Sequence, residues 1–486
     1  MKRQRIFAST WSVRAGLMAC LPILLWPGFA SHADGGSSVS EPQRSLLRQA
    51  ARHQRHGWIY LHIEGAPRER GFQHGYLLAG EIAERLRVTR RLWEHDSALE
   101  WSWLLDKTVP FIEPKIDAEN VAEIDGIVEG LKAAGVSSSR AELMVYNAWF
   151  ELDWYWWPKE KKKMMETDVP HPVKQSCSSF IATGNMTADG GVVLGHNSMV
   201  DYPEAAYNVI LHIAPEMGHC ILMQTAPGLI HSGTDFFVTD AGLVGSETTI
   251  GSFNGFDEQG IPEFARVRRA MQDASSIEQW CETMKRGNNG GYANAWLLGD
   301  VRSGEIARLE LGLKHLRLEK KRDGYFIGSN IAEDLKILRF ETDANENDVR
   351  LSNIARRVRW NKLMARHAGK IDLKLAKQFE ADHHDSYFGK ENPGARTLCG
   401  HYELDDQVWG AWPGAPFYPA GTFDAKVVDS SMAKEMSLAA RWGSACGRPF
   451  DAQAFLAAHP QFDWMKDILE SRPAQPWTTF RAGEKN

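Results

Sequence analysis

The 486-residue chain lacks the glycine patterns that cradle phosphate groups in nucleotide-binding proteins. It contains neither a Walker motif nor a G-x-G-x-x-G segment, and no segment repeats at a fixed period. Nucleotide chemistry and repeat architectures are therefore not supported. Charged residues make up 24% of the chain and hydrophobic residues 43%, close to the averages for globular proteins, so we expect most of the chain to fold.

The chain also lacks a basic cluster of the size that nucleic-acid binding requires. Residues 1–33 contain four basic and no acidic side chains, so the rest of the chain has 52 basic and 62 acidic residues. A formal charge of −10 without residues 1–33 makes a poor nucleic-acid binder. The basic stretch from Lys159 to Lys163 is too short to change this balance. We expect no nucleic-acid partner.

The apolar run near the N-terminus, Ala15–Ala30, is too short and too interrupted by proline for a membrane span, which needs about 20 apolar residues. It follows several basic residues and precedes the small-x-small sequence Ser31-His32-Ala33, a pattern typical of a secretory signal peptide. We therefore assign residues 1–33 to a signal peptide and expect a secreted or periplasmic protein. The alternatives are an uncleaved N-terminal anchor and a lipoprotein box at Leu17–Cys20.

Cysteine is scarce, and one of the six cysteines, Cys20, lies in the expected signal peptide. The remaining five are Cys177, Cys220, Cys281, Cys399 and Cys446. An odd number leaves at least one thiol unpaired in an oxidising compartment. Cys177 is the candidate for that thiol, whereas the other four either form disulfides or are buried, reduced apolar side chains.

The periodicity of the sequence changes at about residue 158. Residues 34–157 have apolar side chains three and four apart and are expected to be helical, whereas residues 158–176 contain three prolines and are expected to form an exposed linker or propeptide. Residues 177–486 contain strand-like runs with helices between them, such as a hairpin over Cys177–Asn197 and a helix over Met432–Trp442. Strand hairpins with segregated helices predict an α+β fold.

Cys177 directly follows the expected linker. If the bond between Ser176 and Cys177 is cut, Cys177 becomes a new N-terminus that carries both a thiol nucleophile and an α-amine base. His196 follows nineteen residues later, which fits the opposite arm of the hairpin. There it would orient the cysteine or transfer a proton.

Several short motifs form an ordered set along the chain. They are Arg70–Gly75, Glu123–Gly126, Cys177–Ser179, Gly195–Asn197, Asp235–Phe237, Glu247–Ile250, Arg266–Arg268, Tyr292–Trp296 and, after Asp382 and His383, Arg396–Cys399. With this set the chain resembles the phospholipase B-like proteins and the related isopenicillin N acyltransferase-type cysteine hydrolases, both of the N-terminal-nucleophile (Ntn) superfamily. The resemblance implies an αββα layered sandwich, in which 34–157 is the light fragment and 177–486 the heavy fragment of a self-cleaved enzyme.

The resemblance also implies roles for individual residues. Cys177 attacks an acyl carbon while its own α-amine relays the proton to the leaving group. Asn294 donates its side-chain N–H to the oxyanion, a contact whose loss typically costs about 3 kcal/mol of transition-state stabilisation. Thr248 or Thr249 hydrogen-bonds near the nucleophile, and we prefer Thr248. Met199 stands where the family has an aromatic residue, so the resemblance does not define the shape of the acyl pocket.

We expect no metal and no organic cofactor. Asp382 and His383 could position other groups or bind a metal, but the run His383-His384-Asp385 lacks the ligand spacing of a zinc site, so we expect both to be structural. Tryptophans gather before the linker, where they pack in the core or line an acyl-chain cleft that faces lipid. They are Trp149, Trp154, Trp156 and Trp157.

The sequence therefore predicts a secreted cysteine hydrolase that acts on the acyl amide or ester bond of a small molecule, either a lipid or an N-acyl amide. We expect its two cleavage fragments to stay associated and the enzyme to make peripheral contact with membrane lipid. One alternative is an uncut acyl hydrolase or acyltransferase in which Cys177 works with His196 or His383. Another is a non-catalytic lipid- or ligand-binding protein in which Cys177 and His196 are structural.

Overall fold

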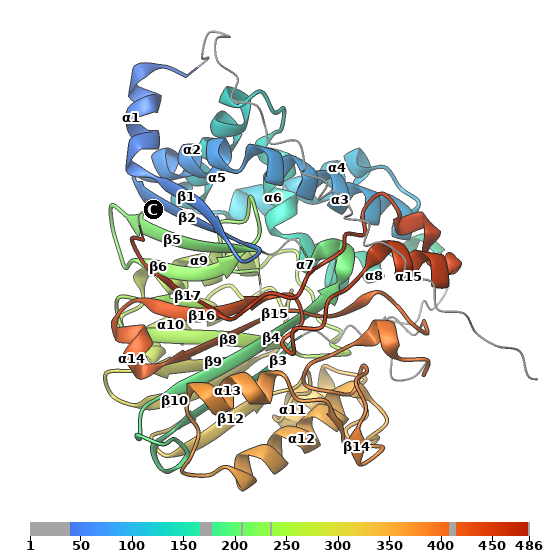
Figure 1. Ribbon diagram of the computed structural model, residues 1–486. Coiled ribbons are helices and arrows are strands. Elements are labelled where there is room, and N and C mark those ends of the chain that lie inside the picture. The colour runs from blue at the N-terminus through green and yellow to red at the C-terminus, as the bar shows by residue number, and fades with distance from the viewer. Residues whose placement is uncertain (1–38, 166–176, 206–207, 234–235, 408–414, 485–486) are drawn as a thin grey trace, which may run out of the picture.

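The computed structural model describes residues 39–165, 177–205, 208–233, 236–407 and 415–484. Within them, the main strands form a nine-stranded and a six-stranded sheet (Figure 1). The order of the larger sheet is β1 (Ala51–Arg55), β2 (Trp58–Gly65), β5 (Val209–Pro215), β6 (Ile221–Thr225), β7 (Phe237–Thr239), β8 (Leu243–Thr249), β9 (Asn294–Asp300), β10 (Glu305–Leu311) and β11 (Leu316–Lys321). The order of the smaller sheet is β12 (Gly324–Gly328), β3 (Ser178–Thr183), β4 (Val193–Asp201), β15 (Ala420–Asp429), β16 (Ser437–Trp442) and β17 (Thr478–Arg481).

Helices cover the outer faces of both sheets, and Figure 1 shows the blue and teal helices at one end of the molecule and the orange helices at the other. The N-terminal helices are α1 (Glu41–Gln49), α2 (Pro67–Leu77), α3 (Ala79–Ser97), α4 (Trp101–Ile112), α5 (Ala118–Ala133), α6 (Arg140–Asn147), α7 (Trp149–Glu151) and α8 (Trp157–Met165), with a π-helix at Leu152–Trp156. The later helices are α9 (Glu263–Asp273), α10 (Ile277–Lys285), α11 (Leu335–Phe340), α12 (Ser352–Arg366), α13 (Leu373–Glu380), α14 (Ser430–Lys434) and α15 (Ala452–Ala458).

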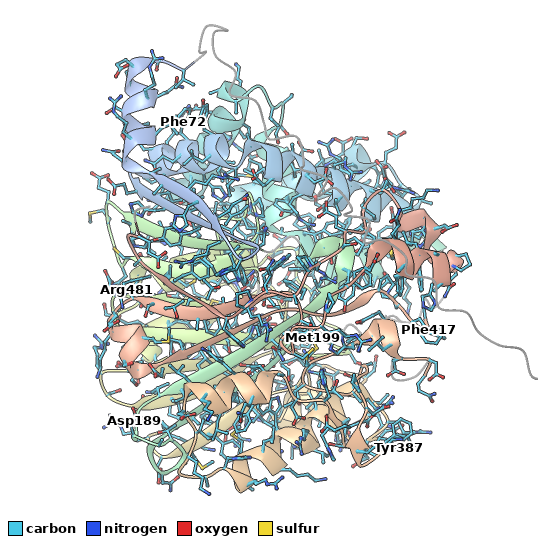
Figure 2. All side chains as sticks on the ribbon, in the orientation of Figure 1. Phe72, Asp189, Met199, Tyr387, Phe417 and Arg481 are labelled. Atoms are coloured by element: carbon cyan, nitrogen blue, oxygen red, sulfur yellow. The ribbon has the colours of Figure 1, made fainter. Side chains whose placement is uncertain are left out.

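The two sheets pack face to face because both contribute apolar side chains to one buried layer. Ile181 and Leu194 of the smaller sheet meet Val244 and Leu297 of the larger sheet there. Successive side chains of a strand point to opposite faces, so the neighbours of these residues point outward. Figure 2 shows the side chains that fill the space between the layers.

The strand that follows Cys177 is buried on both faces. Phe180 and Ala182 pack outward against α12 and α13, with the rings of Phe180 and Trp360 5.2 Å apart, while Ile181 faces the other sheet. β3 pairs antiparallel with β4, which confirms the predicted hairpin over Cys177–Asn197. Helices, two sheets and helices follow one another through the molecule, which confirms the predicted α+β fold with αββα layers.

Three local predictions are wrong. The N-terminal part is not helical throughout, because β1 and β2 form a hairpin and β2 runs parallel to β5. The first half of the expected linker is helix α8, where lysine and glutamate favour helix and Pro158 stands in the first turn. The expected helix over Met432–Trp442 is the end of α14 followed by β16, a strand with both faces covered.

Two expected segments lie outside the described residues: the signal peptide, 1–33, and the second half of the linker, 166–176, which includes Ser176. The division into light and heavy fragments therefore stays a prediction. In the part of the chain that the structure describes, no helix is both long enough and apolar enough to pass through a membrane.

Candidate active site

Cys177 lies directly before β3, at the end of the smaller sheet, with only 3% of its surface exposed. Its φ angle is +74°, in the left-handed region that residues other than glycine rarely adopt. Such a conformation typically costs about 1–2 kcal/mol and persists only where the surrounding structure imposes it. The candidate nucleophile is therefore held in a strained backbone conformation at its own N–Cα bond.

Glu247, on β8 of the facing sheet, provides an acidic group beside the thiol. The sulfur of Cys177 lies 3.7 Å from Oε1 of Glu247, and the hydroxyl of Tyr292 donates to the same oxygen at 2.9 Å. Oε2 of Glu247 is buried and has no hydrogen-bond partner among the described residues. A carboxyl group with one unoccupied oxygen beside a thiol is arranged to accept a proton.

His196, on β4, completes the group. Its Nε2 donates to the backbone carbonyl of Glu247 at 3.0 Å, and its buried Nδ1 has no partner among the described residues. One side-chain atom each from Cys177, His196 and Glu247 lie within 4.8 Å of one another. The hydrogen bond to a carbonyl oxygen fixes the proton on Nε2, so the ring is oriented by the strand that carries Glu247.

Burial dominates the electrostatics of this group. It raises the pKa of Glu247 to about 8, although the hydrogen bonds from Tyr292 and Cys177 and the charge of Lys426 oppose the shift. Burial and the neighbouring Glu247 raise the pKa of Cys177 well above its ordinary value, and burial lowers the pKa of His196 well below its own. At neutral pH the site therefore holds a thiol, a mostly protonated carboxyl group and a neutral imidazole.

A buried arginine hydrogen-bonds to the backbone of Cys177, the candidate nucleophile. Nη1 of Arg356, on α12, donates to the carbonyl oxygen of Cys177 at 2.6 Å, and its Nη2 donates to Oδ1 of Asn330 at 2.8 Å. Asn330 in turn donates to the carbonyl oxygen of Thr249, at the end of β8. Arg356 thus connects Cys177 to the facing sheet.

The structure does not hydrogen-bond the other two predicted residues to Cys177. Thr248 neighbours Glu247 on β8 and packs against Gly328, and its hydroxyl has no partner among the described residues. Asn294 is the first residue of β9, pairs with Thr249 across the strands and is fully buried. Neither its amide nitrogen nor its amide oxygen has a hydrogen-bond partner in the described ranges. The catalytic roles of Thr248 and Asn294 stay predictions.

Met199, labelled in Figure 2, lies three residues beyond His196 on β4. Its backbone N–H hydrogen-bonds to the sulfur of Cys177 and favours the thiolate. Its side chain is buried against Gly400, where a Cβ atom would come within 3.0 Å of the methionine sulfur. The residue that departs from the family pattern therefore contacts both Cys177, the candidate nucleophile, and the loop around Gly400.

Aromatic side chains of the N-terminal part reach this site. Tyr292, which binds Glu247, stacks on Phe150 with 5.4 Å between the ring centroids and meets the edge of Trp154 at 5.9 Å. All four tryptophans singled out in the sequence are buried. Trp154 thus contacts Tyr292, the residue that hydrogen-bonds to the candidate catalytic carboxyl group of Glu247.

A cavity of about 680 Å³ lies elsewhere, between α3 and the segment that follows β4. Its walls include Arg85, Tyr202, Pro203 and Arg472. Its described lining contains none of Cys177, His196, Glu247 and Asn294. The contacts of the Cys177 thiol, and not this cavity, therefore define the candidate active site.

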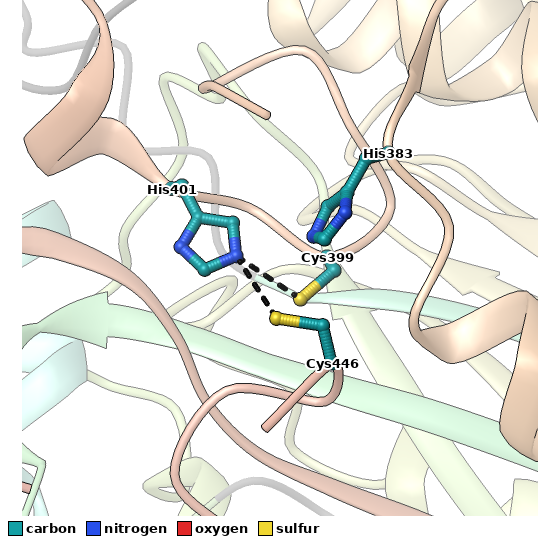
Figure 3. Close-up of side chains that lie close together, drawn as sticks. All are labelled: His383, Cys399, His401 and Cys446. Atoms are coloured by element: carbon teal, nitrogen blue, oxygen red, sulfur yellow. Dashed lines mark hydrogen bonds between the residues drawn. The ribbon is translucent and has the colours of Figure 1, made fainter. Parts of the chain in front are cut away.

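The structure also contains a second cluster of possible metal ligands, which the run His383-His384-Asp385 does not reveal. The structure brings His383 together with Cys399, His401 and Cys446, whose ligand atoms lie within 4.8 Å of one another (Figure 3). The folded chain therefore brings together four candidate metal ligands, of which the run His383-His384-Asp385 contains only one. Asp382 is not part of this cluster and forms an ion pair with Arg359.

Comparison with known proteins finds that residues 118–310 match the sequence model of the family Phospholipase B. The predicted resemblance to the phospholipase B-like proteins is confirmed. A protein named Phospholipase B from Crotalus adamanteus is 28% identical over 43% of this chain and 40% of its own length. One named Phospholipase-B 81 from Drysdalia coronoides is 26% identical over 57% and 52%. The chain thus spans about half or less of the length of these phospholipase B relatives.

The range that matches Phospholipase B includes Cys177, His196, Glu247 and Asn294, whereas Arg356 and the His–Cys cluster lie beyond it. Two solved structures are also similar. A mutant of conjugated bile acid hydrolase from Clostridium perfringens shares 12% identity at a TM-score of 0.32, covering 55% of this chain and 89% of that one. Penicillin V acylase from Agrobacterium tumefaciens shares 12% identity at a TM-score of 0.31, covering 55% and 83%.

Proposed function

We propose that the protein is a secreted or periplasmic cysteine hydrolase that matures by scission between Ser176 and Cys177 and then cleaves an acyl amide or ester bond. The observation that carries this proposal is the placement of a strained, buried Cys177 with its sulfur 3.7 Å from a carboxyl group. The family match of residues 118–310 supports hydrolysis of acyl bonds.

In the maturation step, the carboxylate form of Glu247 accepts the proton of the Cys177 thiol. The sulfur attacks the carbonyl carbon of Ser176, the C–N bond breaks, and the released amine takes up a proton. The product is a thioester that water hydrolyses, giving a carboxylate on Ser176 and a free thiol and amine on Cys177. Scission also releases the left-handed φ angle of Cys177, since that torsion no longer joins two residues.

In the catalytic cycle, the thiol of Cys177 attacks the acyl carbon of the substrate, and its α-amine takes the thiol proton and delivers it to the leaving group. The thioester that forms is hydrolysed by water, which frees the acid and restores the thiol. Asn294 donates its amide N–H to the oxyanion of both steps, since its fully buried amide group has no partner among the described residues. His196 positions the nucleophile from β4, and Thr248 supports it from β8.

The two fragments stay associated after scission. The light fragment contributes β1 and β2 to the nine-stranded sheet, and β2 pairs with β5 of the heavy fragment from Ile59↔Val209 to Gly65↔Pro215. Its helices share one apolar core with strands and helices of the heavy fragment. Separation would break this ladder and expose that core to water.

The substrate class we favour is a lipid with an ester-linked acyl chain, because the relatives are named phospholipase B and aromatic side chains surround Tyr292 beside Glu247. N-acyl amides require the same thiol chemistry and are the second class. Peripheral contact with membrane lipid would deliver the first class to the site. No cofactor takes part in these steps.

Intact-mass analysis and N-terminal sequencing of the purified protein test the maturation. We expect two chains, one of which begins at Cys177, and a single chain for Cys177→Ala. Cys220→Ser, which alters a cysteine directly before β6 of the nine-stranded sheet, is the control and should mature normally. Release of fatty acid from phosphatidylcholine micelles and from N-acyl amino acids then identifies the substrate. A single uncut chain with full activity would refute the maturation and favour an uncut pair of Cys177 and His196.

A further inference from the structure

The second cluster unites side chains from three separate segments. His383 immediately precedes the short strand β13 (His384–Asp385), Cys399 and His401 follow β14 (Lys390–Glu391), and Cys446 lies in the turn after β16. Figure 3 shows the four side chains close together, with dashed lines from the ring of His401 to the sulfur atoms of Cys399 and Cys446. Nε2 of His401 lies 3.5 Å from the sulfur of Cys399 and 3.5 Å from the sulfur of Cys446.

We propose that His383, Cys399, His401 and Cys446 form a structural Zn²⁺ site. Two thiolates and two imidazoles are a common tetrahedral ligand set of zinc. Zinc bonds of about 2.0–2.3 Å in a tetrahedron place the ligand atoms roughly 3.3–3.8 Å apart, which matches the spacing around His401. Because the protein fills all four positions, the ion would have no open position for a substrate, so its role is to hold the fold together.

The surroundings of His401 orient it as a metal ligand. Its Nδ1 lies 3.0 Å from Oε1 of Glu403, and the hydroxyl of Tyr202 donates to Oε2 of the same carboxylate at 2.8 Å. A carboxylate that accepts from one ring nitrogen fixes the proton there and leaves the other nitrogen unprotonated toward the ion. Glu403 and His401 are both buried, so this arrangement does not depend on solvent.

The surroundings of His383 and Cys446 also favour metal binding. Nε2 of His383 is buried and has no hydrogen-bond partner among the described residues, an expensive arrangement unless the nitrogen binds something. The backbone N–H of Arg448 donates to the sulfur of Cys446 at 3.4 Å, which favours a thiolate. The turn that carries Cys446 depends on Gly443 and Gly447, which both have left-handed φ angles.

The zinc site would fasten the loop that supports the candidate active site. Cys399 and His401 flank Gly400, which packs against the sulfur of Met199, and Met199 hydrogen-bonds to Cys177 through its backbone. The carbonyl oxygen of Leu398 accepts from the side chain of Asn197, next to His196 on β4. The ion would therefore connect the turn after β16 to the segment Cys399–His401, which packs against β4.

A disulfide between Cys399 and Cys446 is the competing use of these thiols in an oxidising compartment. In the structure both cysteines are unbridged. A disulfide would also leave the convergence of His383 and His401 on the two sulfurs without a purpose. Metal binding uses all four groups, so we favour it.

Elemental analysis of the full-length protein, purified without a metal-affinity step, tests the proposal. We expect about one zinc per chain in the wild type and a loss of at least tenfold in Cys446→Ser and His383→Ala. Cys220→Ser, which removes a thiol outside the cluster, should keep its zinc. Replacement by Co²⁺ in the wild type should give the intense visible absorption of a tetrahedral cobalt–thiolate site, which requires no variant to fold.

The same preparations separate the metal from the disulfide. A wild type without zinc whose non-reduced peptide map joins Cys399 to Cys446 would overturn the proposal, as would zinc that persists in both cluster variants. The thermal midpoint gives an independent readout, because a strong chelator should lower it in the wild type and leave it unchanged in Cys446→Ser. Neither measurement depends on acyl hydrolysis or on cleavage before Cys177.

Discussion

The sulfur of Cys177 and the carboxyl group of Glu247 lie 3.7 Å apart, although they come from different sheets and are seventy positions apart in the chain. Burial raises the pKa of Glu247 to about 8, so the carboxyl group is mostly protonated at neutral pH. Only the ionised form of Glu247 can take the thiol proton, so in the proposed maturation the reactivity of Cys177 depends on the protonation state of this carboxyl group. The groups of the candidate site are therefore in contact, but at neutral pH most of Glu247 is in the protonated form that cannot accept the thiol proton.

The rate of self-cleavage should rise with pH and level off above about 8, because the carboxylate fraction of Glu247 increases through its pKa. Glu247→Gln cannot accept the proton and should cleave about 10²–10⁴-fold more slowly. Its residual rate should keep rising above pH 8, since it then depends on ionisation of the thiol itself. The fraction cut over time on denaturing gels, from pH 5 to pH 10, measures both profiles.

Glu310→Gln provides the control for this profile. Glu310 is also a buried glutamate, but it lies on β10 and its carboxylate accepts from the backbone N–H groups of Glu333 and Asp334. Its replacement should lower the stability without moving the pH profile of cleavage. If Glu247→Gln and Glu310→Gln show the same profile, Glu247 is not the base.

Tyr292→Phe should move the cleavage profile of the protein to higher pH. The hydroxyl of Tyr292 donates to Oε1 of Glu247 at 2.9 Å and opposes the rise of its pKa. Loss of a hydrogen bond to a charged group is worth about 1.5–3 kcal/mol, so the midpoint should shift upward by roughly 1–2 pH units. In Tyr60→Phe the lost bond goes to the carbonyl oxygen of Arg481, so an equal shift in that variant would contradict the assignment.

The nucleophile hairpin could be predicted because its turn and its apolar runs are local. β2 could not, since Ile59 and Leu61 face the helices while Trp58 and Tyr60 face the other sheet, and a strand with two apolar faces does not alternate. The helical pattern of residues 34–157 as a whole then favours the wrong assignment. Periodicity reports the faces of an element only where one face is exposed to water.

The site could be predicted in part for a similar reason. Cys177 and His196 lie on one hairpin, so their proximity follows from local pairing. Glu247 lies within the motif Glu247–Ile250, but its proposed role depends on two sheets facing each other, which no spacing in the sequence reveals. The only signal was a charged residue in an otherwise uncharged strand, Leu243–Thr249. Arg356 gave no local signal, because its partner Cys177 lies far along the chain. Cys399 and His401 are close in sequence, but only the folded chain brings His383 and Cys446 to them.

Asn294→Ala should reduce kcat/KM of the mature enzyme by about 10²–10³-fold, the typical loss for an oxyanion donor. It should cost less than about 1 kcal/mol of stability, because neither amide atom has a hydrogen-bond partner among the described residues. Asn147→Ala is the opposite case, since that side chain bonds to the backbone of Leu143, Gly228 and Ile230. Urea denaturation and acyl-hydrolase kinetics on both variants separate the roles, and a destabilised but fully active Asn294→Ala would show that Asn294 is structural.

Arg356→Lys should slow self-cleavage by at least tenfold while the fold survives. The guanidinium donates at once to the carbonyl oxygen of Cys177 and to Oδ1 of Asn330, and a lysine ammonium keeps the charge but cannot span both acceptors in that fixed geometry. The left-handed conformation of Cys177 should then relax before the thiol can attack. Arg357→Lys, one residue along α12, is the matched control, because Arg357 pairs with Glu333 and not with the nucleophile. Cleavage time courses of the two variants at pH 8 test this prediction, with circular dichroism to confirm that both variants fold. Equal rates would mean that the contact of Arg356 with the carbonyl oxygen does not hold Cys177 in its reactive conformation.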